Sequence, residues 1–219
     1  MNLSKETLTL IRNFASINGS IVFKQGNTLA TISEGKNVMA SATIAESFPQ
    51  DFSIYDLNEF LGAAGIFTNT VLDFQDKYVT ISDGGNSKIK YFAAGEGLVK
   101  AAPQTIKFPD PDVAFNLTQD QLALILKTSS ALKAGDVAIT GDGSTLRIVV
   151  SDKKNATSNA YQVDIGTTDA TFTANIKVEN LKMLPGDYEV AVSSKKISRF
   201  KNVNTDLTYY VAIESDSEF

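Results

Sequence analysis

The chain has 219 residues, of which 43% are hydrophobic and 21% charged, and its formal net charge is −5. It contains no histidine and no cysteine, which excludes the commonest general base, the usual zinc ligands, a thiolate nucleophile and any disulfide framework. The negative net charge argues against a nucleic-acid-binding protein of generally basic character. Contact with nucleic acid would need a local basic face.

No apolar run approaches the roughly 20 residues that a membrane-spanning helix needs. The first residues also lack the succession typical of a secretory signal, because Lys5, Glu6 and Arg12 interrupt their apolar positions. We therefore expect a cytoplasmic protein that does not contact a membrane.

The first predicted element is a helix from Glu6 to Ser16, with Ser4 as its N-cap. At 3.6 residues per turn its apolar residues share one side, and its polar side contains the cations Lys5 and Arg12. Short strands separated by turns rich in glycine and asparagine follow it. These strands cover residues 21–24, 28–33, 38–44, 78–82 and 88–93, with a short helix at 56–62.

Residues 94–112 contain Pro103, Pro109 and Pro111 and show no sustained periodicity, which is typical of an extended connector. The predicted domains are therefore residues 1–93 and 113–219, joined by the connector 94–112.

The second half repeats the layout of the first. A helix is predicted from Gln119 to Leu132, with Thr118 as its N-cap and Lys127 on its exposed side, and a short second helix is predicted at 180–186. Strands are predicted at residues 137–140, 145–151, 161–165, 188–192 and 209–213. The expected fold class is α+β, with two similar domains that each pack two helices on antiparallel sheets.

Five sequence blocks, in order along the chain, resemble the sliding clamps of T4-type bacteriophages. They are residues 3–7 (LSKET), 13–18 (NFASIN), 54–62 (IYDLNEFLG), 183–188 (MLPGDY) and 210–219 (YVAIESDSEF). The resemblance implies a DNA-clamp fold and a homotrimer that closes into a pseudo-sixfold ring around duplex DNA, without base readout. The implied partners are duplex DNA, the replicative DNA polymerase, a clamp loader and late-transcription factors, in the cytoplasm of an infected bacterial host. No cofactor and no metal are implied.

The resemblance further implies that cations on the exposed helix faces contact DNA phosphates. The expected DNA-facing residues are Lys5, Arg12, Lys127, Lys133, Lys177 and Lys182. The alternative for each is an ordinary solvated surface charge. Because the second half has fewer basic positions on its first helix, the charge of the channel is expected to be uneven.

Subunits of clamps join through edge strands in a head-to-tail interface. The matching stretches are residues 88–93 and 159–165, so Tyr91 and Phe92 are expected to meet Tyr161 and Val163 of the next subunit. The alternative is that these four side chains belong to the cores of their own domains.

Partners of clamps insert a short peptide with apolar anchors beside the connector. The residues expected at this pocket are Val99, Phe108, Pro109, Tyr210, Ala212 and Ile213. A second basic group, Lys195, Lys196, Arg199 and Lys201, is expected in a hairpin loop, either solvated or in contact with DNA or the loader.

Two other kinds of protein remain as alternatives. A duplicated structural protein of a phage particle would have no need for Lys5, Arg12 and Lys127 to converge. A hydrolase would have to use carboxylates alone, and the pairs Asp110 with Asp112 and Asp216 with Glu218 lie in connector and tail sequence. We therefore expect no enzyme.

Overall fold

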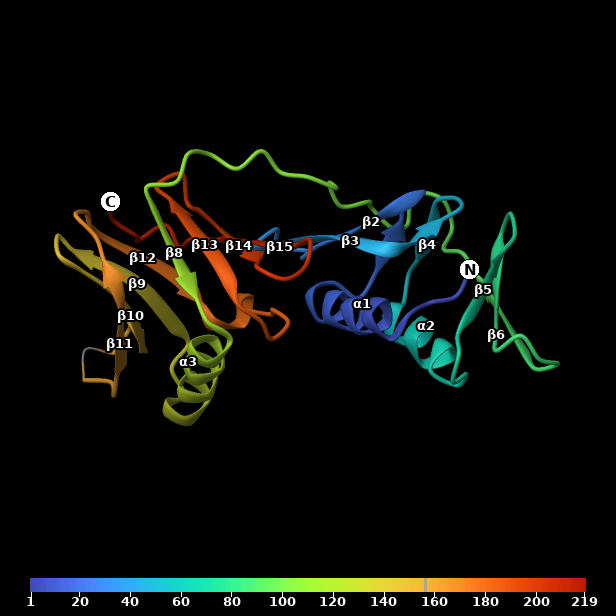
Figure 1. Ribbon diagram of the computed structural model, residues 1–219, viewed down its shortest axis with the longest axis horizontal. Coiled ribbons are helices and arrows are strands. Elements are labelled where there is room, and N and C mark those ends of the chain that lie inside the picture. The colour runs from blue at the N-terminus through green and yellow to red at the C-terminus, as the bar shows by residue number, and fades with distance from the viewer. Residues whose placement is uncertain (156) are drawn as a thin grey trace. The chain divides into compact units, whose positions relative to one another are not determined.

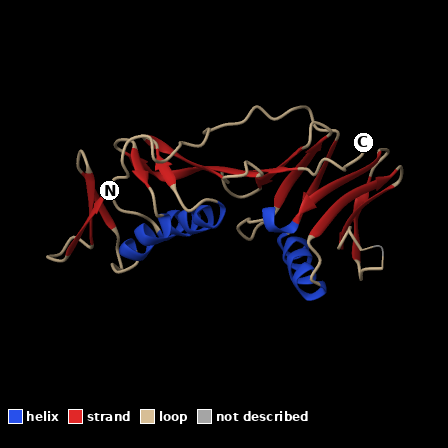
Figure 2. Cartoon of the chain, turned by 180° about the vertical axis from the view of Figure 1, so that it is seen from behind, coloured by secondary structure: helices blue, strands red, loops and turns tan. Residues whose placement is uncertain are grey.

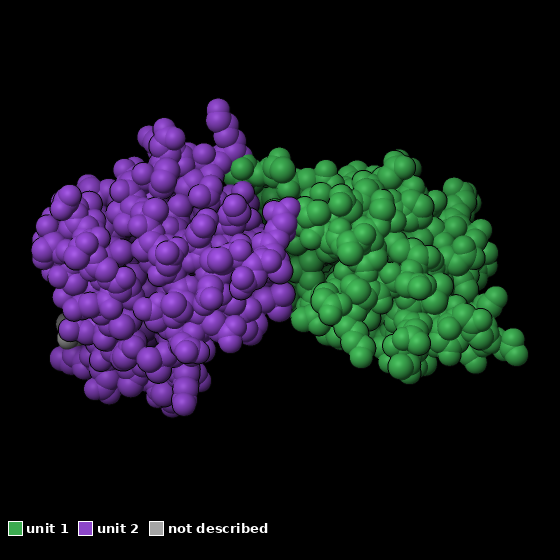
Figure 3. Space-filling view, in the orientation of Figure 1, with its two compact units in different colours: residues 1–106 green, residues 107–219 purple. Residues whose placement is uncertain are grey.

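The computed structural model describes residues 1–155 and 157–219. The chain divides into two compact units, unit 1 (residues 1–106) and unit 2 (residues 107–219), coloured separately in Figure 3. The division lies inside the stretch 94–112, which forms neither helix nor strand.

Unit 1 has two helices, α1 (Lys5–Ile17) and α2 (Leu57–Ala64), which pack against each other (Figure 1). Each begins at a side-chain cap: Ser4 Oγ accepts a hydrogen bond from Thr7 N at 3.1 Å, and Asp56 Oδ1 accepts one from Glu59 N at 2.9 Å. Such caps satisfy backbone donors that have no partner within the helix.

Seven strands complete unit 1. They are β1 (Ile21–Phe23), β2 (Gly26–Ile32), β3 (Val38–Phe48), β4 (Phe52–Ile54), β5 (Val71–Phe74), β6 (Tyr78–Ser82) and β7 (Lys88–Phe92). All pairings are antiparallel: β1 with β4, β2 with β3, and β5, β6 and β7 in that order in one sheet. Aromatic rings fill the core, where Phe23 stacks on Phe48 at 4.6 Å and meets Phe60 of α2 edge-on at 5.9 Å.

Unit 2 has one helix, α3 (Gln119–Leu132), a 3-10 turn η1 (Val178–Asn180) and eight strands among its described residues. The strands are β8 (Val113–Leu117), β9 (Asp136–Asp142), β10 (Thr145–Ser151), β11 (Tyr161–Thr167), β12 (Thr171–Lys177), β13 (Tyr188–Ser193), β14 (Ile197–Asn202) and β15 (Leu207–Ala212). One antiparallel sheet has the order β11-β10-β9-β12, and β8, β13, β14 and β15 pair antiparallel in that order. Figure 1 labels these strands, and Figure 2 shows the strands in red and the helices in blue.

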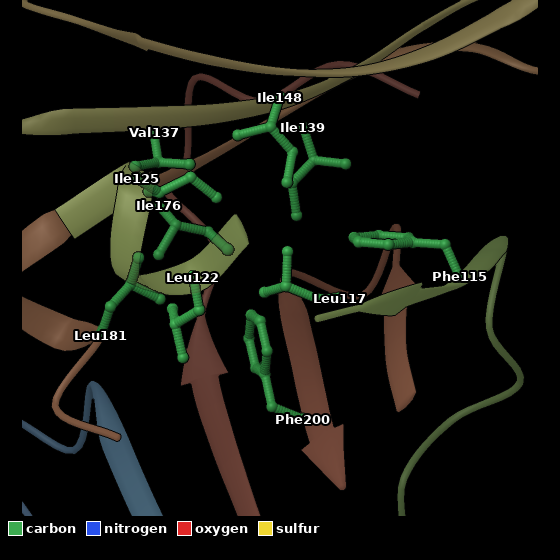
Figure 4. Close-up of a pocket in the computed structure, with 10 residues that line it drawn as sticks. All are labelled: Phe115, Leu117, Leu122, Ile125, Val137, Ile139, Ile148, Ile176, Leu181 and Phe200. Carbon is green, nitrogen blue, oxygen red and sulfur yellow. The ribbon is translucent and has the colours of Figure 1, made fainter. Parts of the chain in front are cut away.

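Apolar side chains from α3 and from both sheets of unit 2 converge on one point of its core (Figure 4). They leave a void of only about 20 Å³. A void of this size, lined by residues such as Leu122, Ile148 and Phe200, has room for about one water molecule and offers that water no polar side chain. It is a small packing defect and not a ligand site.

The helix predicted at 180–186 is absent, and that prediction is wrong. Only η1 forms, followed by an irregular segment up to Asp187. Pro185 has no N–H and disfavours the helical conformation of Leu184 before it. Two tyrosines bind the backbone of Leu184 instead: its N–H donates to the Tyr209 hydroxyl at 3.1 Å, and the Tyr188 hydroxyl donates to its carbonyl at 2.5 Å. The described part of unit 2 therefore has one α-helix where unit 1 has two.

The basic group expected in a hairpin loop is divided between a turn and a strand. Lys195 and Lys196 form the turn between β13 and β14, and Lys196 has a φ of 63°. Arg199 and Lys201 instead lie within β14, where they alternate with the buried residues Ser198 and Phe200. The loop prediction was wrong for these two residues because it gave the charges more weight than this alternation.

No described helix has the length and apolar character that crossing a membrane requires.

Candidate functional site

The exposed face of α1 contains two cations. Lys5 and Arg12 are both exposed, on the side opposite the buried Leu8, Ile11 and Phe14. No salt bridge to either cation occurs among the described residues. Both remain available to an anion from outside the chain.

Glu46 of β3 anchors the beginning of α1. Its carboxylate accepts hydrogen bonds from Ser4 N at 2.5 Å and from Thr7 Oγ1 at 2.7 Å. Burial by itself would raise the pKa of Glu46, but the hydrogen bonds from Ser4 and Thr7 outweigh it, and the pKa lies below its usual value. A carboxylate at a helix N-terminus also interacts favourably with the helix dipole. Glu46 thus fixes the end of α1 from which Lys5 projects.

The exposed face of α3 is less basic. A capping box fixes its start: Thr118 Oγ1 accepts from Gln121 N at 3.3 Å, and Gln121 Oε1 accepts from Thr118 N at 2.9 Å. Lys127 is exposed on this helix, but so are Asp120 and Leu124, and Leu124 is 45% exposed. Charge on the exposed faces of the two helices is therefore uneven.

The other predicted DNA-facing lysines differ from one another in their surroundings. Lys133 is the exposed C-cap of α3, in the left-handed conformation with a φ of 53°. Lys182 is exposed in the segment after η1. Lys177, at the end of β12, instead forms a salt bridge of 2.5 Å with Asp136, and that hydrogen bond raises the pKa of Lys177 above its usual value. Lys177 is thus bound to a carboxylate of its own unit.

The strand β7 is an edge strand, since it pairs only with β6 among the described residues. Its two aromatic residues point to opposite faces. Tyr91 packs edge-on against Phe60 at 5.4 Å, and its hydroxyl donates to Asp56 O at 3.0 Å; burial and the nearby Glu59 raise its pKa to about 12. Phe92 is 61% exposed and lies beside Tyr78 with a ring separation of 5.8 Å. Of the two, Phe92 is the one available to a partner.

The strand β11 is the corresponding edge in unit 2 and pairs only with β10 among the described residues. Tyr161 and Val163 lie opposite the buried Val150 and Ile148, so they stand on the inner face of the sheet. Both remain half-buried because no further strand covers that edge.

A groove of about 330 Å³ lies on the sheet of unit 2 that contains β8, β13 and β14. Ala191 of β13 stands between Ala114 of β8 and Arg199 of β14, and the two small alanine side chains leave the hollow. These positions alternate with Leu117 and Phe200, which point into the core, so the groove opens on the other face of the sheet. Its full lining is Pro111, Ala114, Phe115, Asn116, Glu189, Val190, Ala191 and Arg199.

Arg199 is the distinctive polar group of this groove. Its guanidinium carbon lies 5.0 Å from the centre of the Phe108 ring, a cation–π contact. Its Nε is buried without a hydrogen-bond partner among the described residues.

Of the six residues expected at the partner pocket, only some lie near this groove. The ring of Phe108, which covers Arg199, is 6.3 Å from that of Tyr210, and Pro109 follows Phe108; both Phe108 and Pro109 are half-buried. Val99 is half-buried in unit 1, Ala212 is half-buried at the end of β15, and Ile213 is buried. Sequence reasoning missed the two alanines and assigned Arg199 to a loop; the alternation around Phe200 was the signal that would have placed Arg199 in a strand.

The carboxylates considered for chemistry have structural roles. Asp112 accepts a hydrogen bond from Ser194 N at 2.6 Å, and Asp216 forms a 2.7 Å salt bridge with Lys153; these contacts lower both carboxyl pKa values. Among the residues that the structure describes, no group of three or more Asp and Glu residues is arranged to bind a metal ion.

Two family models match the chain in succession. The model described as DNA polymerase processivity factor matches residues 4–107, and that described as gp45 sliding clamp, C terminal, matches residues 114–215. The sliding clamp of Vibrio phage KVP40 is 31% identical over 98% of this chain and 100% of its own length, and that of Enterobacteria phage T4 is 31% identical over 99% and 98%.

Solved structures show the same fold at low identity. PCNA from Entamoeba histolytica matches with a TM-score of 0.68 at 14% identity over 94% of both chains. PCNA from A. fulgidus, bound to the C-terminal region of FEN-1, matches with a TM-score of 0.71 at 13% identity over 96% of both. The DNA-clamp fold and the resemblance expected from the sequence are therefore confirmed. The chain belongs to the sliding clamp family of DNA polymerase processivity factors.

Proposed function

We propose that three copies of this chain close head to tail into a ring that encircles duplex DNA and tethers the replicative DNA polymerase, with no catalytic step of its own. The observation that supports this most strongly is the match to phage sliding clamps over nearly the whole of both chains. No comparison favours a structural protein of a phage particle.

The edge strands β7 and β11 support the head-to-tail contact. Each has one backbone edge without a strand partner among the described residues, and each presents apolar side chains, namely Phe92 on β7 and Tyr161 and Val163 on β11. Pairing β7 of one copy with β11 of the next would satisfy both edges. Because the joined surfaces differ, the contact repeats until the ring closes.

The DNA contact is proposed for Lys5 and Arg12 of α1 and Lys127 of α3, with Lys133 and Lys182 as weaker contributors. All five are exposed. Lys177 is assigned a structural role because Asp136 neutralises it. A small number of phosphate contacts suffices for a ring, since topology retains it on DNA while the electrostatic contacts allow sliding.

The groove between Ala114, Ala191 and Arg199 is proposed to bind the polymerase, through a peptide with an apolar anchor and an acceptor for the Arg199 guanidinium. The clamp loader and late-transcription factors are proposed to use the same groove, which would make their binding mutually exclusive.

The decisive experiment measures the mass of the assembly by sedimentation and then its retention on DNA after loading. A trimer that stays on closed circles, leaves linear DNA and is retained again when both linear ends are blocked is the expected result. Equal release from circles and from linear DNA would contradict the ring, because only a topological link distinguishes these substrates.

A further inference from the structure

The outer edge of β12 is occupied by the segment Glu214–Phe219, which follows β15. Thr173 N donates to Glu218 O at 2.8 Å, and Glu218 N donates to Thr173 O at 2.9 Å. Asn175 uses its own backbone in the same way: its N–H donates to Ser217 Oγ at 2.9 Å, and its carbonyl accepts from Glu214 N at 2.8 Å. The outward backbone groups of β12 at positions 173 and 175 are therefore satisfied.

Side chains fix this segment in place. Lys153 forms a 2.7 Å salt bridge with Asp216, and Lys196 Nζ donates to Ser217 O at 2.5 Å. The ring of Phe219 stacks on that of Phe172 with a separation of 5.8 Å. Ser217 is only 6% exposed. The segment is therefore seated on β12 by three kinds of contact at once.

The segment Met1–Leu3 occupies the edge of β5 in unit 1 in a similar manner. Leu3 N donates to Thr70 O at 2.8 Å, Leu72 N donates to Met1 O at 2.7 Å, and Asn2 forms an antiparallel bridge with Val71. Leu3 is buried, at 7% exposure. Each of two sheets, β5-β6-β7 and β11-β10-β9-β12, thus has one edge covered by a short segment of its own unit. The opposite edge, β7 or β11, has no such cover from any residue that the structure describes.

We propose that Met1–Leu3 and Glu214–Phe219 are edge guards, which block strand addition at β5 and β12 and leave β7 and β11 as the open edges of these two sheets. An uncovered strand edge accepts any extended chain, including another copy of the same protein. Were β12 open, its sheet would offer two edges, and copies could add at either one. Such additions produce open or branched assemblies in place of a closed ring. The guards thereby determine which edge of each of these two sheets a second copy can meet.

The choice of β7 and β11 as partners rests on the proposed ring, whereas the guarding of β12 is measured independently of it. The test compares the intact chain with a variant that ends at Ile213, by sedimentation velocity over a wide range of concentrations. The expected result is that the shortened chain forms species larger than the intact assembly, in a fraction that increases with concentration. Amide hydrogen exchange at Thr173 and Asn175 is expected to be about tenfold faster or more.

A point variant distinguishes loss of the edge guard from misfolding of the shortened chain. Glu218→Pro removes the N–H that donates to Thr173 O, and Glu218→Ala, its matched control, retains that N–H. Larger species from Glu218→Pro but not from Glu218→Ala would support the guard. Identical mass distributions for the intact chain, the shortened chain and both point variants would overturn it. If the intact chain is a monomer, the ring fails, yet the difference between intact and shortened chains still decides the guard.

Discussion

Lys177 Nζ lies 2.5 Å from Asp136 Oδ1, and Asp136 is only 5% exposed. The second oxygen of this carboxylate accepts a hydrogen bond from Lys153 N at 3.2 Å. The pair links the first residue of β9 to the last residue of β12, because Lys177 lies directly opposite Asp136 in the antiparallel pairing of these strands. One lysine expected to contact DNA therefore stabilises the sheet of unit 2.

Lys177→Met is expected to lower the free energy of unfolding by about 1–3 kcal/mol, because the buried Asp136 carboxylate would lose the hydrogen bond from its cation. The salt bridge raises the pKa of Lys177 above its usual 10.5, so its contribution is fully present below pH 10.5 and disappears as the pH rises through the folded-state pKa. Urea unfolding of both proteins at pH 8 and above pH 11 measures this difference. If the difference in unfolding free energy between the two proteins were the same at both pH values, the stabilising role of the Lys177–Asp136 salt bridge would be contradicted.

The next variant combines Lys5→Glu, Arg12→Glu and Lys127→Glu. It is expected to lower polymerase stimulation and to reduce the salt dependence of DNA binding, because it reverses the charge of three exposed side chains that are proposed to contact DNA phosphates. The mass of the assembly should not change. The control reverses Lys36, in the turn between β2 and β3, and Lys154, in the loop after β10, both exposed. Equal loss of stimulation in the control would show a general charge effect and not a DNA-binding face.

Sequence patterns predicted the two long helices well, because capping residues and a 3.6-residue apolar period mark them directly: α1 and α3 begin right after Ser4 and Thr118. They failed at 180–186, where Pro185 and the hydrogen bond that Leu184 N donates to the distant Tyr209 hydroxyl decide the backbone. They also failed to predict the groove. Its hollow depends on Ala114 and Ala191 standing side by side on strands more than seventy residues apart in sequence, a register that local periodicity does not contain.

Ala191→Leu is expected to fill the groove and to weaken binding of the polymerase by about tenfold or more, because a larger side chain would occupy the hollow between Ala114 and Arg199. Arg199→Ala is expected to weaken polymerase binding as well, because it removes the guanidinium that would donate to the bound peptide. Lys201→Ala on the same strand is the matched control, since Lys201 is exposed and does not line the groove. Calorimetric titration with the polymerase measures all three, and unchanged affinity for Ala191→Leu would place the binding site elsewhere.

Glu46→Gln is expected to destabilise unit 1 by about 1 kcal/mol at neutral pH, because charged acceptors form stronger hydrogen bonds than amides. The carboxylate binds Ser4 N and Thr7 Oγ1 at the start of α1, and these bonds hold its pKa below the usual 4.5. For a lowered carboxyl pKa, the stabilisation is present above pH 4.5 and disappears as the pH falls through the folded-state value. Unfolding free energies of the two proteins should therefore differ at pH 7 and converge in acid. Should the difference persist below pH 3, neutral packing and not the charge of Glu46 would anchor the helix from which Lys5 projects.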